Sequence, residues 1–283
     1  MSTSHSSSFS TDFMMFQIHL TDEEKLVKQS AREFVNKEVL PIIEKHAQDQ
    51  TFPRDLIAKM GSLGFLDDYL KIIKKMKSGL IARYKMAGQI ILSILISYFL
   101  ISYSETSNFN SSVTIPFLKN VTINLGFFYP VMVVFVITGT SNAVNLTDGL
   151  DGLAAGLLAI SFTVFSAISY ITGRIDFSDY LNIIYLPDAG ELTIFSAAMA
   201  GACVGYLWFN AHPAEVFMGD TGSLSTGAAL GTLAVLLKKE LLLIIIGGVF
   251  VFEALSVIIQ VTYYRFTKDR NGQGERFFKM API

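Results

Sequence analysis

Carboxylate and amide side chains gather in three short motifs within an otherwise apolar sequence. The motifs are Asp67-Asp-Tyr-Leu-Lys71, Asn142-Ala-Val-Asn-Leu-Thr-Asp-Gly-Leu-Asp151 and Phe217-Met-Gly-Asp-Thr-Gly-Ser223, the last preceded by Asn210-Ala-His-Pro213. A polar cluster between hydrophobic segments is costly unless it meets water or lines a site. We therefore expect these motifs to line a site.

The residue types in the three motifs favour magnesium–phosphate chemistry. Clustered oxygen ligands with few thiol or imidazole groups suit Mg²⁺, with Mn²⁺ as an alternative. Magnesium takes one or two carboxylates and shares its remaining positions with water and phosphate oxygens. A lysine-rich stretch follows the first motif. Lysine neutralises phosphate, the metal takes up charge on a leaving diphosphate, and a carboxylate can act as the base.

Each motif alone has a simpler interpretation. An Asp-Asp pair is common at solvated helix ends, and Asp220 could simply cap a helix that begins after a turn. The lysines could anchor a helix to anionic lipid. The chemical interpretation therefore depends on whether the three motifs lie on one side of a membrane.

The composition is that of a membrane protein. The chain has 283 residues, of which 51% are hydrophobic, and its mean hydropathy is +0.46. About six apolar segments approach the roughly 20 residues that a bilayer requires. They cover residues 87–103, 124–140, 153–172, 192–209, 223–237 and 241–263. The net charge of −2 gives no indication of nucleic-acid binding, and the single cysteine, Cys203, excludes an intramolecular disulfide.

Lysine and arginine are unevenly distributed among the connecting segments. Residues 67–85 and the tail after Tyr264 are rich in both, whereas the loops at 104–123, 173–191 and 238–240 hold few. The positive-inside rule places the first group in the cytoplasm. Alternating six spans then brings all three acidic motifs to the cytoplasmic side. Because the rule uses only lysine and arginine, this convergence independently supports one shared site.

The first 66 residues are more polar and predict soluble helices. Residues 1–19 are expected to form a disordered tail. Thr21 and Glu24 form a capping box, apolar residues recur at helical spacing as far as Pro41, and a second helix is expected at about 53–63. The predicted fold is all-α: a polytopic membrane core with about six transmembrane helices, preceded by a soluble helical hairpin.

The hairpin segment, residues 20–66, resembles the N-terminal helical region of acyl-CoA dehydrogenases. The matching residues are Leu20-Thr-Asp-Glu-Glu24, Ala31-Arg-Glu-Phe34, Glu38-Val-Leu-Pro41, Phe52-Pro-Arg-Asp-Leu56 and Gly61-Ser-Leu-Gly-Phe65. The flavin-contacting strands and catalytic glutamate of that family have no counterpart here. No flavin is therefore expected, and a dehydrogenase function is disfavoured.

Residues 64–283 resemble the phospho-N-acetylmuramoyl-pentapeptide transferases, the MraY family of the polyprenyl-phosphate N-acetylhexosamine-1-phosphate transferase superfamily. The resemblance rests on five segments, four of which contain the motifs described above. The segments are Gly64–Lys71, Thr140–Gly156, Trp208–Ala214, Val216–Ser223 and Gly272–Ile283. The last segment favours this family over relatives that use UDP-GlcNAc.

The resemblance implies a Mg²⁺-dependent reaction at the cytoplasmic face of the bacterial inner membrane. Phospho-MurNAc-pentapeptide passes from UDP to undecaprenyl phosphate, forming lipid I and UMP for peptidoglycan synthesis. By similarity, Asp67 is the base, Asp68 lies beside it, Lys71 is near phosphate, Asp220 binds Mg²⁺ and Asp148 lies near the metal and diphosphate. The residues implied to shape the nucleotide pocket are Asn145, Gly149, Leu150, Asp151, Asn210 and Phe217, with Phe217 stacking on uracil.

The chain also departs from the family's pattern. The family has further spans before its Asp-Asp motif, and a histidine run and final spans after the last matched segment. We therefore expect a transferase core at 67–283 that is truncated at both ends and fused to the segment at 20–66. The alternatives left open are a non-catalytic chimera and a transferase that uses UDP-GlcNAc. A homodimer is a further open possibility.

Overall fold

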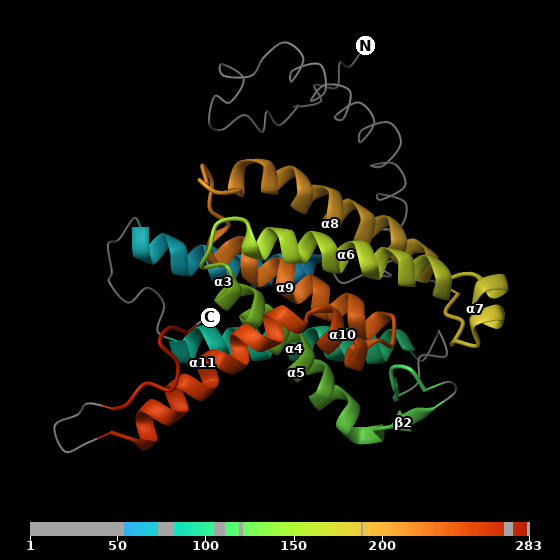
Figure 1. Cartoon of the computed structure of the whole chain (residues 1–283). Helices are drawn as coiled ribbons and strands as arrows, with labels where there is room; N and C mark the ends of the chain where they lie inside the picture. The colour runs from blue at the N-terminus through green and yellow to red at the C-terminus, as the bar shows by residue number, and fades with distance from the viewer. Residues whose placement is uncertain are drawn as a thin grey trace, which may run out of the picture. The chain divides into compact units, whose positions relative to one another are not determined.

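The computed structural model describes residues 54–72, 82–104, 111–118, 121–187, 189–268 and 274–281. All of them belong to one compact unit, Thr51–Ile283. The expected tail at 1–19 and the expected helix at 21–41 lie outside the described residues. The described part is mostly helical, which confirms the all-α polytopic fold (Figure 1). Its helices are α3 (Arg54–Ile72), α4 (Ala82–Ser104), α5 (Tyr129–Thr147), α6 (Leu153–Thr172), α7 (Ile175–Leu181), α8 (Ala189–Asn210), α9 (Gly219–Leu236), α10 (Glu240–Ile246) and α11 (Gly248–Phe266).

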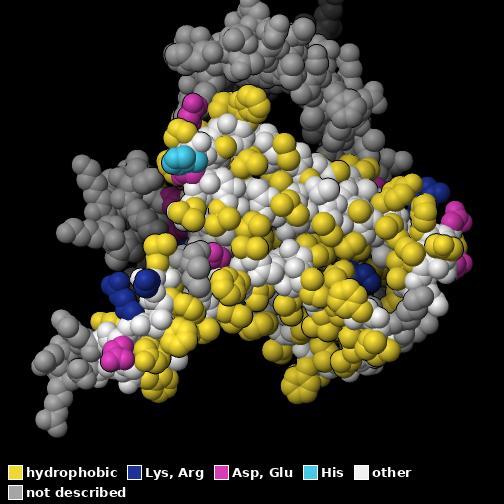
Figure 2. All heavy atoms as spheres, in the orientation of Figure 1, with side chains coloured by type: hydrophobic (Ala, Val, Ile, Leu, Met, Phe, Trp, Pro, Cys, Tyr) yellow, Lys and Arg dark blue, Asp and Glu magenta, His cyan; other side chains and the backbone are white. Residues whose placement is uncertain are grey.

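Four helical segments of the described residues are long and apolar enough to cross a membrane. They are Gly126–Thr147, Leu153–Thr172, Ala189–Asn210 and Gly248–Phe266. Two other predicted segments, 87–103 and 223–237, correspond to α4 and α9. Figure 2 shows apolar side chains spread over the face of these helices and charged side chains mainly toward the ends. This distribution suits contact with lipid.

The last apolar segment, predicted as one span at 241–263, is divided in the structure. Helix α10 ends at Ile246 and α11 begins at Gly248. Glycine is a poor helix former, and sharp changes in helix direction concentrate at such residues. The pair Gly247 and Gly248 therefore accounts for the division.

Helix α9 forms the buried centre of this unit. It packs against α3 and α5, while α6 pairs with α8 and α4 lies against α5. Most residues of α9 from Ser223 to Val235 are buried. Small residues allow this close packing: a Cβ atom at Gly227 would lie 2.7 Å from the Cα atom of Ser141 on α5.

Helix α3 is longer than the sequence predicted. The helix expected at about 53–63 continues to Ile72, so Asp67 and Asp68 lie on a helix rather than in a connecting segment. A Cβ atom at Gly64 would lie 2.2 Å from the backbone oxygen of Asp220. Glycine thus allows α3 to approach the start of α9 closely, and this packing supports the helix beyond residue 63.

The connections between helices divide into two ends. The α5–α6 and α8–α9 connections, the end of α3 and the start of α4 lie together at one end (Figure 1). At the other end lies a short antiparallel hairpin, which the sequence did not predict, of β1 (Ser112–Thr114) and β2 (Thr122–Asn124). The acidic motifs therefore meet at one end of the helices, as the alternating topology predicts.

Candidate functional site

Asp67, Asp68, Asp148 and Asp220 form a carboxylate cluster at the end of the helices where the acidic motifs meet. Asp67 and Asp68 come from α3, Asp148 follows α5, and Asp220 lies in the first turn of α9. The three motifs lie far apart in the sequence and come together because α9 packs against both α3 and α5. The structure thus brings together the four predicted catalytic carboxylates.

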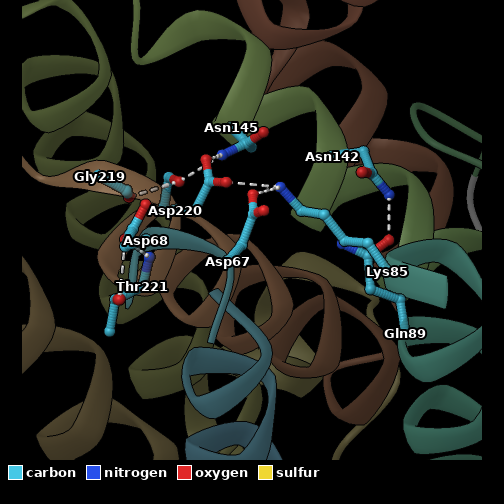
Figure 3. A network of polar contacts seen from close by, with 10 residues as sticks. Asp67, Asp68, Lys85, Gln89, Asn142, Asn145, Gly219, Asp220 and Thr221 are labelled. Atoms are coloured by element: carbon cyan, nitrogen blue, oxygen red, sulfur yellow. Dashed lines mark hydrogen bonds and ion pairs between the residues drawn. The ribbon is translucent and has the colours of Figure 1, made fainter. Parts of the chain in front are cut away.

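Lys85 lies at the centre of this cluster. Its Nζ atom is 2.7 Å from Oδ2 of Asp220 and 3.4 Å from Oδ2 of Asp67 (Figure 3). Asp67 is 2% exposed, so its charge is removed from water and needs a partner of opposite sign. Lys85, from the first turns of α4, therefore joins α3 to α9 and offsets part of the negative charge.

Asn145 binds the other oxygen of the Asp220 carboxylate. Its Nδ2 atom donates to Oδ1 of Asp220 at 2.6 Å and to Oγ of Ser223 at 2.9 Å. The two oxygens of Asp220 are thus held by donors from different helices, Lys85 on α4 and Asn145 on α5. This arrangement fixes the direction of the carboxylate.

Asp68 binds the start of α9. Its Oδ2 atom accepts hydrogen bonds from the backbone N–H of Thr221 at 3.2 Å and from the Thr221 hydroxyl at 3.1 Å. A carboxylate near a helix N-terminus satisfies free backbone donors and interacts favourably with the helix dipole. Asp68 therefore helps to hold α3 on α9, and Asp220 is not itself the cap.

The pKa of Asp148 is higher than that of an ordinary aspartate. Burial raises its pKa to about 6, a hydrogen bond from the backbone N–H of Gly219 acts in the opposite direction, and the charges of Asp220 and Asp68 raise it further. A carboxylate with a raised pKa near other carboxylates is typical of functional sites. This one can hold or release a proton near neutral pH.

The two connecting loops are joined by Asp151 and Asn210. Oδ2 of Asp151 lies 3.0 Å from Nδ1 of His212 and accepts a hydrogen bond from the backbone N–H of Ala214 at 3.1 Å. These two contacts, the N–H of Ala214 first, lower the pKa of Asp151. Oδ1 of Asn210 accepts from the backbone N–H of Gly152 at 3.1 Å. Both predicted binding residues thus hold the α5–α6 loop against the α8–α9 loop.

The remaining predicted residues are Gly149, Leu150, Phe217 and Lys71. Leu150 and Phe217 are exposed, at 62% and 72%, and Gly149 lies in the turn after Asp148. Lys71 lies near the end of α3, but its side chain is outside the described residues. Within the described residues, no group of three or more His, Cys, Asp or Glu side chains is arranged to hold a metal ion.

Sequence reasoning missed Lys85 and Ser223 as members of the site. Lys85 was one of several lysines between the first motif and the first apolar segment, and Lys74 and Lys75 offered the same signal. The distinguishing feature is position: Lys85 lies within α4, so its side chain is carried by a packed helix. Spacing in the sequence does not show which lysine faces the carboxylates.

Two family models match this chain. The family model described as glycosyl transferase family 4 matches residues 56–238. The model for the acyl-CoA dehydrogenase N-terminal domain matches residues 21–71. The two matches overlap within α3, where the carboxylates Asp67 and Asp68 lie.

Curated relatives named phospho-N-acetylmuramoyl-pentapeptide-transferase are similar over most of the chain. The protein from Chloroherpeton thalassium is 52% identical over 224 residues, which cover 79% of this chain and 61% of the relative. The protein from Thermodesulfovibrio yellowstonii is 51% identical, covering 79% and 60%, and that from Chlorobium chlorochromatii is 50% identical, covering 79% and 61%. The chain thus spans about three fifths of the length of these relatives. On the strength of the family model and these identities, the chain belongs to glycosyl transferase family 4.

Proposed function

We propose that this protein transfers phospho-MurNAc-pentapeptide from UDP to undecaprenyl phosphate at the cytoplasmic face of the bacterial inner membrane. The names of the relatives support the muropeptide substrate. The observation that carries the proposal is the carboxylate of Asp220, held by Lys85 and Asn145 beside the buried Asp67. Such an arrangement suits the positioning and charge stabilisation on which phosphoryl transfer depends.

The reaction is a displacement at phosphorus. An oxygen of the lipid phosphate attacks the phosphorus bonded to the sugar, and the bond from that phosphorus to the oxygen of UMP breaks, so UMP leaves with the electron pair. Asp67 accepts the proton of the lipid phosphate. Lys85 and Lys71 offset the negative charge of the phosphates that meet there.

The residues present fit a magnesium ion. Asp220 and Asp148 supply two carboxylates, and magnesium usually takes one or two in phosphate sites. Burial, and after it repulsion from Asp220 and Asp68, raises the pKa of Asp148, and a cation there would relieve the repulsion. Bound Mg²⁺, or Mn²⁺ in its place, would stabilise the negative charge that develops on the leaving UMP.

The joined loops are suited to the nucleotide. Asp151 and Asn210 hold the loops in place, and the exposed ring of Phe217 offers a stacking surface for uracil. Gly149 and Leu150, in the turn after Asp148, would contribute to the same nucleotide surface, and Asn145 would join it to Asp220, to which it donates a hydrogen bond.

The test is UMP release by the purified full chain with UDP-MurNAc-pentapeptide, undecaprenyl phosphate and Mg²⁺. Asp220→Asn should lower the rate by at least about 100-fold, because removal of one charge-stabilising group typically costs that much. The matched control is Asp176→Asn, which changes an exposed carboxylate at the opposite end of the helices.

Three results would overturn parts of the proposal. UMP release from UDP-GlcNAc instead would change the donor. No UMP above the Asp220→Asn background would identify a non-catalytic chimera. Equal losses in Asp220→Asn and Asp176→Asn would remove the assignment of Asp220.

A further inference from the structure

Gln89 is a fully buried amide next to the site that has no role in the reaction as proposed. It lies one turn after Lys85 on α4, and its Oε1 atom accepts a hydrogen bond from Nδ2 of Asn142 on α5 at 2.7 Å. The same Nδ2 donates to the backbone oxygen of Thr138 at 2.9 Å, which fixes the orientation of the Asn142 amide. The Nε2 atom of Gln89 is buried and has no hydrogen-bond partner among the residues that the structure describes. Burying an unpaired donor opposes folding, so stability alone does not account for an amide here.

The Gln89–Asn142 contact belongs to a row of polar contacts between α4 and α5. The α4 residues of this row are four apart, so they lie on one face of the helix. The three contacts are Gln89 to Asn142 at 2.7 Å, Ser93 to Thr138 at 3.0 Å and Ser97 to the backbone oxygen of Pro130 at 3.5 Å. Directional contacts of this kind set the axial position of one helix on another, which apolar packing against lipid or protein specifies less sharply.

The row ends at the two donors that hold Asp220. Lys85 precedes Gln89 by four residues on α4, and Asn145 follows Asn142 by three residues on α5. Lys85 and Asn145 bind opposite oxygens of the Asp220 carboxylate at 2.7 and 2.6 Å. Figure 3 shows the Gln89–Asn142 contact beside Lys85. The separation of the donors therefore depends on how α4 is seated on α5 at this contact.

We propose that Gln89 is a positioning residue, which through Asn142 sets the seating of α4 on α5 and hence the geometry in which Lys85 and Asn145 hold Asp220. Its effect on turnover rests on the proposed function, whereas its effect on Lys85 does not. The Gln89→Met variant keeps the length of the side chain and removes the acceptor. Ser93→Ala is the matched control, because it removes a contact of the same row that lies one helical turn farther along α4 from Lys85 and should therefore disturb Lys85 less.

The first measurement follows Lys85 without using activity. The full chain in detergent is treated with acetic anhydride, and acylation of Lys85 is timed by peptide mass spectrometry, with Lys268 as an internal reference. Gln89→Met should speed acylation of Lys85 about fivefold, the factor that corresponds to one net hydrogen bond of about 1 kcal/mol. Asn142→Leu and the double variant should give the same increase, and Ser93→Ala should leave the rate within about twofold.

The second measurement is UMP release by the same four variants. Gln89→Met should lower kcat by about 10- to 100-fold, as expected for misplacement of a catalytic group by about 1 Å, with KM for the donor little changed. The double variant should be no worse than either single variant, because both remove one contact.

The outcomes separate the two proposals. Faster acylation of Lys85 without UMP release in the parent chain would support the positioning role and count against the proposed function. Unchanged acylation in Gln89→Met, or an equal increase in Ser93→Ala, would overturn the positioning role whatever the turnover. Additive losses of kcat in the double variant would also contradict it.

Discussion

Replacing Gly64 with alanine tests whether close contact between α3 and α9 assembles the site. A Cβ atom at this position would lie 2.2 Å from the backbone oxygen and 2.4 Å from the backbone carbon of Asp220, and 2.5 Å from the backbone nitrogen of Thr221. These are backbone atoms at the start of a packed helix, so they cannot rotate away as a side chain can. Ordinary contact begins at 3.4 Å, and α3 must therefore move by about 1 Å or more to relieve the overlap.

The displacement acts directly on the carboxylate cluster. Asp67 and Asp68 follow Gly64 by three and four residues on the same helix, so they move away from Lys85 and Thr221. We expect Gly64→Ala to lower the free energy of unfolding by about 1–3 kcal/mol, the usual cost of overpacking. We also expect a loss of turnover of about 100-fold, which a misplacement of 1 Å can cause.

Gly61 supplies the matched control on the same helix. A Cβ atom at Gly61 would lie 3.3 Å from Cβ of Ser225 and from the backbone oxygen of Thr221, so a shift of a few tenths of an ångström is enough. The better helix propensity of alanine, worth up to about 1 kcal/mol, offsets this strain. Thermal unfolding in detergent and UMP release would be measured for both variants. If Gly64→Ala matched Gly61→Ala in both measurements, close α3–α9 contact would not be what assembles the site.

Three further predictions concern groups around the site. The pKa of Asp148 is raised from 3.8 to about 6, so its contribution to stability is present below about pH 4 and is lost as the pH rises through about 6. Asp148→Asn should remove that part of the pH dependence of thermal unfolding. An unchanged pH profile in the variant would contradict the assignment. In Gly227→Ala the added Cβ would lie 2.7 Å from Cα of Ser141, so the free energy of unfolding should fall by about 1–3 kcal/mol. Gly205→Ala is the control, because a Cβ there meets no atom within 4 Å. Equal midpoints of thermal unfolding for the two variants would refute the packing argument. Asp151→Ala should speed backbone hydrogen exchange at Ala214, because the N–H of that residue loses its acceptor, and unchanged exchange by mass spectrometry would show that the loop is held otherwise.

The sequence alone singled out the four carboxylates that the structure brings together. Two motifs with paired polar residues and a third with Asp220 stood out because carboxylates are costly among apolar spans. The structure brings Asp67, Asp68, Asp148 and Asp220 to one end of the helices, as the topology argument expected. The helical fold was also predictable, since long apolar segments leave few ways to satisfy the backbone in lipid.

Helix boundaries and packing partners were less predictable. The sequence placed the end of a helix near residue 63, whereas α3 continues to Ile72 because Gly64 lets it approach α9. It treated 241–263 as one span, whereas the structure divides it at Gly247. Both differences arise because the packing of a helix and the glycines within it determine where it ends. The hydropathy of the sequence contains no information on either.

The types and order of the site residues are properties of the sequence, whereas their partners are decided by tertiary structure. Asp220 could be singled out from its motif, but its binding to Lys85 on α4 and Asn145 on α5 depends on three helices meeting at short range. Gln89 and Asn142 are separated by 53 residues in the chain, and no spacing rule pairs them. Hydrogen bonds and ion pairs require the two atoms to lie within about 3 to 4 Å of each other. Only the packed arrangement of α3, α4, α5 and α9 meets this condition.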